Sequence, residues 1–192
     1  VDLLLPSGVG SETDRAAVVA GLPAENKAFI EQLRTKYNVP PATKATFFSS
    51  QIRSQQLFAE QIDAVLGSSA DAFAAGIGLP ASVIQRAAQC GKFTISLVGS
   101  AKHAVAAKTA GVDLIVAQGA DAGGHTGPIG TYSLVPQVVE AAGDVPVLAA
   151  GGVGHGRHIA AAFGLGAQGV WLGTAWLTSR EHAFNEILLR QV

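Results

Sequence analysis

Residues 146–173 read PVLAAGGVGHGRHIAAAFGLGAQGVWLG, and this stretch contains one complete repeat of the pattern that decides the fold. A short apolar run ends in Gly151 and Gly152, and apolar residues at helical spacing then extend from Gly156 to Leu165. A second short apolar run follows at Gly169–Gly173. Runs this short and this continuously apolar are typical of strands covered on both faces. The stretch therefore predicts a strand, a helix and a second strand parallel to the first.

The same alternation repeats along most of the chain, starting near Asp71. Short runs with strand character lie at Ala72–Gly76, Phe93–Val98, Val112–Gln118, Val145–Ala150 and Gly169–Gly173. Between these runs, helical spacing of apolar residues predicts helices at Ala81–Gln89, Ala101–Ala110, Ser133–Ala142 and Gly156–Leu165. A regular series of βα units builds a parallel sheet, which can stay open or close into a barrel.

The N-terminal part of the chain follows a different pattern. Val1–Leu5 has the composition of a strand, whereas we expect the small and polar Gly8–Pro23 region to be a disordered or inserted segment. Two amphipathic stretches predict helices at Glu25–Tyr37 and Gln51–Val65. Together these features predict a helical insertion near residues 24–66.

The amino-acid composition excludes several classes of protein. Of 192 residues, 48% are hydrophobic and 14% are charged, with 13 basic and 14 acidic side chains. These values exclude general intrinsic disorder and argue against binding to nucleic acid or to a membrane surface through a basic field. No stretch approaches the ~18 consecutive apolar residues of a membrane span. The single cysteine, Cys90, excludes an internal disulfide and an all-cysteine metal site. We therefore expect a cytoplasmic protein whose partner is a small molecule.

Three predicted strands end in glycine-rich turns, which lie at Gly119–Gly127, Gly151–Gly154 and Gly173–Thr174. Glycine pairs let the backbone approach a ligand and expose amide N–H groups, so that such turns can bind phosphate. A single glycine-rich turn can be explained simply as a tight end of a strand. Two such turns after successive strands favour the phosphate site that (β/α) barrels place after their last two strands. A dinucleotide fingerprint is not matched, because Arg157 stands where the last glycine would be needed.

His125 is the strongest candidate for a catalytic group. It follows Gly123 and Gly124 at the end of a predicted strand, where a ligand would bind. A base with a pKa near about 6.5 suits proton abstraction, although a turn-capping or solvent-exposed histidine is the plainer interpretation. Asp121 either orients His125 or only caps the loop.

The remaining histidines and the cysteine are weaker candidates. His155 and His158 bracket the start of a predicted helix, but their spacing without a cysteine or carboxylate partner is a poor zinc signal. We expect structural or surface roles for both, and no metal site. His103 and His182 are expected to face solvent, and Cys90 is expected to be a small buried apolar group.

Three segments together resemble the nitronate monooxygenase family, formerly called 2-nitropropane dioxygenases. In chain order they are AQGADAGGHTG (Ala117–Gly127), PVLAAGGVG (Pro146–Gly154) and GAQGVWLGTAWL (Gly166–Leu177). The resemblance implies an FMN-binding (β/α)8 TIM barrel, an α/β fold, formed by residues 1–192 as a single domain. The resemblance implies that the visible strands are the later ones of the eight, about strands 3 to 8, so that we expect an incomplete barrel. The start at Val1 and the absence of methionine fit this expectation. The first two βα units and a C-terminal extension are expected to lie outside this chain.

The resemblance also implies roles for single residues. The implied cofactor-binding residues are Gln118, Gly123, Gly124, Gly151, Gly152, Trp171, Leu172, Gly173 and Thr174, with the FMN phosphate on the last two turns. His125 would be the catalytic base. The family carries a flavin-contacting Asn within a V-N-L pattern on its third strand, and here Val1-Asp2-Leu3 puts Asp2 at that place. A carboxylate normally only accepts hydrogen bonds, so either the contact differs or this strand is misaligned.

The activity that the resemblance implies is FMN-dependent oxidation of alkyl nitronates or nitroalkanes with dioxygen. One alternative in the same architecture is an FMN-dependent enoyl-thioester (enoyl-ACP) reductase, which shares the glycine-flanked histidine and the phosphate turns. Another is a non-catalytic barrel that binds FMN or phosphate without a working base. The sequence leaves open the natural substrate, the use of NAD(P)H and whether the protein forms a homo-oligomer.

Overall fold

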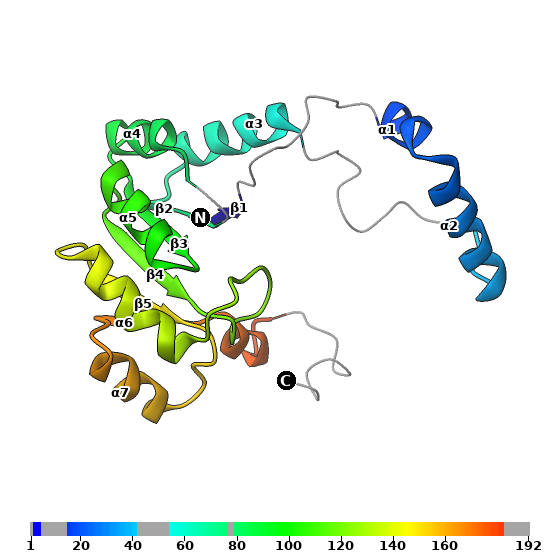
Figure 1. Cartoon of the computed structure of the whole chain (residues 1–192). Helices are drawn as coiled ribbons and strands as arrows, with labels where there is room; N and C mark the ends of the chain where they lie inside the picture. The colour runs from blue at the N-terminus through cyan, green and yellow to red at the C-terminus, as the bar shows by residue number, and fades with distance from the viewer. Residues whose placement is uncertain (1, 5–14, 42–53, 77–78, 183–192) are drawn as a thin grey trace. The chain divides into compact units, whose positions relative to one another are not determined.

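The computed structural model of the chain describes residues 2–4, 15–41, 54–76 and 79–182 (Figure 1). Its contacts divide the chain into two compact units, one formed by Val1–Ser7 with Ala64–Val192 and the other by Gly8–Asp63. The larger unit contains the sheet and every residue expected to bind the cofactor.

The larger unit is built on one sheet of six parallel strands that lie side by side in chain order. The strands are β1 (Asp2–Leu4), β2 (Ala72–Gly76), β3 (Phe93–Val98), β4 (Leu114–Gln118), β5 (Val147–Ala150) and β6 (Gly169–Trp171). The helices that join β2 to β6 are α4 (Ala81–Gln89), α5 (Ala101–Ala110), α6 (Thr131–Ala142) and α7 (Gly156–Gly164). A sheet in which each strand pairs with the next one through a helical crossover is the βα repeat of a TIM barrel. The α/β prediction is confirmed, and the chain contributes six consecutive strands of such a barrel.

The two faces of the sheet differ in what covers them. On one face, side chains from β3, β4 and β5 pack with α4 to α7 into the buried core, and Figure 1 shows these helices along one side of the sheet. The strands contribute to this core Val98, Ile115, Ala117, Val147 and Ala149. On the opposite face, most apolar side chains are only half-buried, as are those of Ile95, Leu97, Leu114, Leu148 and Trp171. In a barrel this second face is the one that points to the interior.

Two strands begin later than the sequence predicts, because the apolar residues before them belong to turns. Val112 is buried, but its N–H donates to the carbonyl of Ala107 while Gly111, with φ of 86°, ends α5. This is the hydrogen-bond pattern of a glycine-capped helix end. Val145 N–H likewise donates back to the end of α6, so β5 begins only at Val147.

Cys90 is exposed, so the prediction that it is a buried apolar group is wrong. The buried stripe of α4 consists of Val83, Ile84 and Ala87. Helical spacing would place the next buried position at Cys90, but α4 ends at Gln89 and Cys90 is its C-cap. Because the chain leaves the helix there, the side chain no longer lies on the buried stripe.

The smaller unit is helical where the structure describes it. It contains α1 (Arg15–Gly21), α2 (Ala24–Lys36) and most of α3 (Gln55–Leu66). The predicted helical insertion is confirmed. Of the two alternatives predicted for Gly8–Pro23, disorder is wrong for α1, whose alanine-rich sequence favours a helix. The alternative of an inserted segment is compatible with its place in the smaller unit. Across the described ranges, no helix is both long enough and apolar enough to cross a membrane.

Candidate cofactor site

A cavity of about 820 Å³ lies at the carboxyl ends of β4, β5 and β6. All three glycine-rich turns contribute to it. The expected cofactor-binding residues that line it are Gln118, Gly123, Gly151, Gly152, Trp171, Leu172, Gly173 and Thr174. The lining also includes Leu97, Val153 and Leu177, which the sequence analysis did not single out and which add apolar surface. Small-molecule sites typically enclose about 300–1,000 Å³, so the cavity has the size of a cofactor site.

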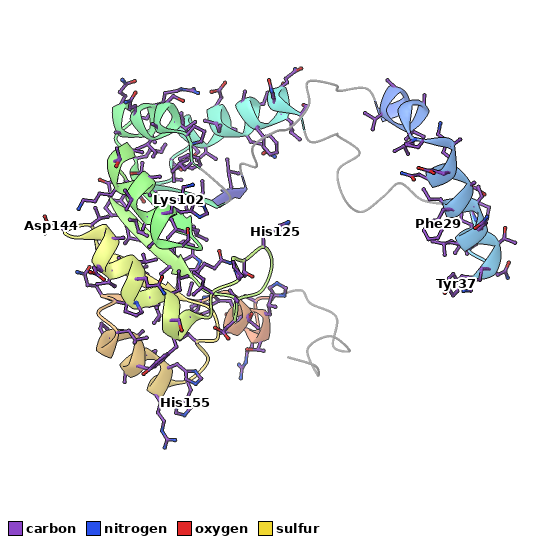
Figure 2. The ribbon with its side chains drawn as sticks, in the orientation of Figure 1. Phe29, Tyr37, Lys102, His125, Asp144 and His155 are labelled. Carbon is purple, nitrogen blue, oxygen red and sulfur yellow. The ribbon has the colours of Figure 1, made fainter. Side chains whose placement is uncertain are left out.

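Gly124 and His125 directly follow the cavity-lining Gly123 in the chain but do not line the cavity themselves. Gly124 has φ of 80°, a left-handed conformation that glycine adopts without steric cost. His125 is exposed, and Figure 2 shows it at the tip of the loop between β4 and α6. Within the described residues, the His125 ring has no hydrogen-bond partner. Its role as a base stays a prediction.

Asp2 lies in β1, where it pairs in register with Ala74 of β2. The side chain of Asp2 lies outside the described part of the structure. Its expected contact with the cofactor therefore stays a prediction.

Asp121 caps α6 and does not orient His125. Its carboxylate Oδ2 accepts a hydrogen bond of 2.7 Å from the backbone N–H of Thr131, the first residue of α6. That backbone bond holds the pKa of the Asp121 carboxyl below its ordinary value of 3.8. The positive end of α6 is thus neutralised by a carboxylate of the chain itself. An anionic ligand in the cavity would have to be held by the other turns.

Thr131 joins the turn after β4 to the turn after β5, a role that the sequence analysis missed. Its single hydroxyl proton is shared between two carbonyl oxygens, that of Gly151 at 3.0 Å and that of Ala150 at 3.2 Å. A Cβ placed on Gly119 would overlap Thr131, and one placed on Gly151 would lie 2.8 Å from Thr131 Oγ1. The turns therefore meet at a distance that only glycine allows. No local pattern signals this contact, because the bonded residues are 19 and 20 positions apart.

The glycine turns leave backbone donors at the cavity. Within the described ranges, the N–H groups of Gly151, Gly152 and Gly173 have no acceptor in the protein. All three residues line the cavity, and Gly151 and Gly152 have positive φ angles of 104° and 70°. Successive backbone N–H groups in such conformations form anion-binding concavities. The turns therefore fit a phosphate group.

His155 and His158 have structural roles, as the sequence predicts. His155 Nδ1 accepts a hydrogen bond of 3.1 Å from Arg157 N–H and so caps α7. His158 Nδ1 accepts one of 3.1 Å from Gly154 N–H. These two bonds fasten the turn after β5 to the start of α7. In the described part of the chain, no three His, Cys, Asp or Glu side chains are grouped to hold a metal ion.

Comparison with protein families gives one match that covers most of the chain. Residues 16–192 match the family model described as Nitronate monooxygenase. A curated relative from Mycobacterium tuberculosis, Rv1533, carries a provisional monooxygenase name and is 40% identical over 189 residues. That match covers 94% of this chain and 50% of the relative. The chain spans about half the length, 42 to 50%, of the curated relatives that it matches.

Two solved structures resemble the chain over most of its length. Nitroalkane oxidase from Streptomyces ansochromogenes superposes with a TM-score of 0.70 and 28% identity, covering 94% of this chain and 51% of that one. FabK from Thermotoga maritima superposes with a TM-score of 0.68 and 26% identity, covering 98% of this chain and 62% of that one.

Proposed function

The chain belongs to the nitronate monooxygenase family, and from that premise we propose that it binds FMN and oxidises alkyl nitronates or nitroalkanes with dioxygen. The observation that carries the proposal is the cavity of about 820 Å³ lined by all three glycine-rich turns. The family is one of flavin-dependent oxidoreductases. The likeness to a nitroalkane oxidase structure supports the substrate class.

The residues of the cavity fit FMN in two respects. The N–H groups of Gly151, Gly152 and Gly173 lack acceptors within the described residues and would hold the phosphate, with the Thr174 side chain beside them. Gln118, Gly123 and the half-buried Trp171 and Leu172 would line the flavin ring, and Gly124 would let the loop approach it. When bound, FMN would supply the electron transfer from the substrate to dioxygen.

We assign His125 the proton chemistry. From the loop that follows β4, its imidazole would remove or relay the α-proton of a neutral nitroalkane, or as the imidazolium would hold the negative charge of a nitronate. Its exposed ring is free of other hydrogen bonds in the described residues, which leaves both nitrogens for the substrate. Catalytic hydrogen bonds are often completed only when the substrate binds, so a position in the loop directly after the cavity-lining Gly123 suits this role.

The decisive experiment measures oxygen uptake by the full-length, FMN-loaded protein with a nitronate and with the matching neutral nitroalkane. We expect the His125→Asn variant to lose about 10²- to 10⁴-fold in kcat with the nitroalkane, the usual contribution of a general base. His103→Asn is the matched control, because His103 is an exposed histidine on α5, away from the cavity. Unchanged turnover of both substrates by His125→Asn would remove His125 from the mechanism.

A second candidate is an FMN-dependent enoyl-thioester reductase. The likeness to FabK from Thermotoga maritima supports it. Consumption of NAD(P)H with a crotonyl-type thioester, without oxygen uptake on a nitronate, would establish this activity in place of the first. Tight FMN binding without either reaction would instead indicate a non-catalytic binding protein.

A cytoplasmic location remains a prediction, which fractionation of cells would test. Light scattering on the purified protein would show whether it forms a homo-oligomer, which the sequence leaves open.

A further inference from the structure

The hydroxyl of Thr131 controls the direction of one peptide plane in the turn after β5. Its oxygen lies 3.0 Å from the carbonyl oxygen of Gly151 and 3.2 Å from that of Ala150, and the Ala150 carbonyl also accepts the N–H of Gly119 at 3.0 Å. Because a hydroxyl has a single proton, the carbonyl that depends on Thr131 is that of Gly151, which has no other donor in the described residues. In a trans peptide, the C=O of one residue and the N–H of the next point in opposite directions. The described part of the chain has no cis peptide bond.

One amide N–H group is directed by this arrangement. Because the Gly151 carbonyl is held toward Thr131, the N–H of Gly152 points away from Thr131. This N–H is one of the three cavity-lining donors that lack an acceptor in the described residues. The peptide plane before it is held by the hydrogen bond from Gly119 N–H to the Ala150 carbonyl.

Glycine makes this control necessary. With φ of 104° and 70°, Gly151 and Gly152 adopt conformations that other residues rarely adopt, but glycine is equally free to leave them. A turn of two glycines would otherwise sample several peptide orientations, and an anion would have to order them on binding. A hydrogen bond from Thr131 to the Gly151 carbonyl reduces that freedom before the ligand arrives.

Asp121 in turn holds Thr131 in place. Its Oδ2 accepts from Thr131 N–H at 2.7 Å, and its Cβ lies 3.1 Å from the position that a Cβ on Gly152 would occupy. Asp121 therefore contacts both the residue that directs the turn and the turn itself. Its carboxylate lies against the start of α6, which offsets the repulsion it would otherwise exert on a bound phosphate.

We propose that Thr131 is a positioning residue for the phosphate of the cofactor: its hydroxyl holds the Gly151 carbonyl and so aims the N–H of Gly152 into the cavity, and Asp121 fixes Thr131. The inference rests on the proposed binding of FMN. It adds a specific consequence, namely that Thr131 acts on the phosphate end of the cofactor and leaves the flavin ring unaffected.

The test compares the binding of FMN and of riboflavin, which lacks the phosphate, to full-length apoprotein by quenching of flavin fluorescence. Thr131→Val keeps the shape of the side chain and removes its hydroxyl. We expect this variant to bind FMN about tenfold more weakly, as the loss of one ordering hydrogen bond predicts, and to bind riboflavin as the wild type does. Thr131→Ser restores the hydroxyl and should restore the ratio of FMN to riboflavin affinity.

Thr109→Val is the matched control. The Thr109 hydroxyl donates at 2.8 Å to the Val105 carbonyl within α5, on a helix that does not line the cavity. This control variant should leave both flavin affinities unchanged. If Thr131→Val does not fold, Thr131→Ala removes the same hydroxyl with a residue that favours helices and gives the same comparison.

The outcomes separate the two proposals. If the wild-type protein binds neither FMN nor riboflavin, the proposed function fails and the inference fails with it. If the wild type binds FMN but Thr131→Val weakens both flavins equally, or weakens neither, only the role of Thr131 is overturned. A selective loss of FMN affinity that Thr131→Ser reverses supports the role.

Discussion

The polar groups at the two ends of the parallel sheet differ in whether they have hydrogen-bond partners within the protein. At the amino ends of the strands, Asp113 Oδ2 accepts from both the N–H of Thr94 at 2.7 Å and its hydroxyl at 2.6 Å. Beside them, the 9%-exposed Lys92 donates from Nζ to the carbonyls of Ser68 and Ala70, each at 2.8 Å. At the carboxyl ends, three glycines line a cavity, and their N–H groups have no acceptor in the described residues.

This difference separates residues that stabilise the fold from residues that are available to bind a ligand. A buried polar group that finds its partner within the protein contributes to stability and has no capacity left for a ligand. A donor left without a partner costs free energy until a ligand accepts from it. The amino ends are therefore expected to determine the free energy of unfolding, and the carboxyl ends the affinity for the cofactor, as in barrels generally.

The largest expected effect is at Gly119, because both the free energy of unfolding and the affinity for FMN depend on its close contact with Thr131. A Cβ there would overlap Thr131, so Gly119→Ala must displace either α6 or the loop after β4. We expect the free energy of unfolding to fall by about 3 kcal/mol and FMN binding to be lost. Urea denaturation and flavin titration measure the two effects. Gly164→Ala, at a glycine of α7 whose Cβ would meet nothing within 4 Å, should be nearly neutral.

A smaller effect, confined to stability, is expected at the amino ends. Asp113→Ala leaves the fully buried Thr94 without an acceptor for its N–H and hydroxyl. The free energy of unfolding should fall by about 2 kcal/mol, while the Kd for FMN stays within a factor of two of the wild type. Asp144→Ala, at an exposed aspartate just after α6 (Figure 2), should change neither quantity. A large loss of FMN affinity in Asp113→Ala would contradict the expectation that the amino ends determine stability and the carboxyl ends determine cofactor affinity.

The smallest expected effect is a pH dependence at the carboxyl ends. The Thr131 N–H lowers the pKa of Asp121, so the folded state favours the ionised carboxyl more than the unfolded state does. The resulting stabilisation is fully present above the ordinary pKa of 3.8 and is lost as the pH falls through the lowered value. The difference in free energy of unfolding between wild type and Asp121→Asn should therefore be constant near neutral pH and shrink below about pH 4. A difference that persists unchanged to pH 2 would mean that the charge of Asp121 contributes nothing.

Much of the fold could be predicted, because its signals are local. Runs such as Phe93–Val98 are apolar over the length of a strand, and Gly111 marks a helix end by its own conformational freedom. The errors are also local in origin. Val112 is as apolar as a strand residue but completes the end of α5, and Cys90 has the spacing of a buried position but follows the last turn of α4.

The candidate site could be predicted in part, for the same reason. Gly151, Gly152 and Gly173 stand out because glycine pairs at strand ends are visible in the sequence, and all three line the cavity. Thr131 could not be found, because its hydroxyl bonds residues 19 and 20 positions away. Nothing in the residues around it distinguishes it from any threonine at the start of a helix.

The sequence by itself determined the order of strands and helices, the strand ends at which the cavity lies, and the family. These follow from periodicity and from glycine, which act over a few neighbouring residues. Only the tertiary structure decided that Asp121 caps α6 instead of orienting His125, that His125 does not line the cavity, and that Thr131 directs the glycine turn. Each of these depends on where separate loops meet in space, and in a parallel sheet the meeting point is fixed by strand pairing between segments far apart in the chain.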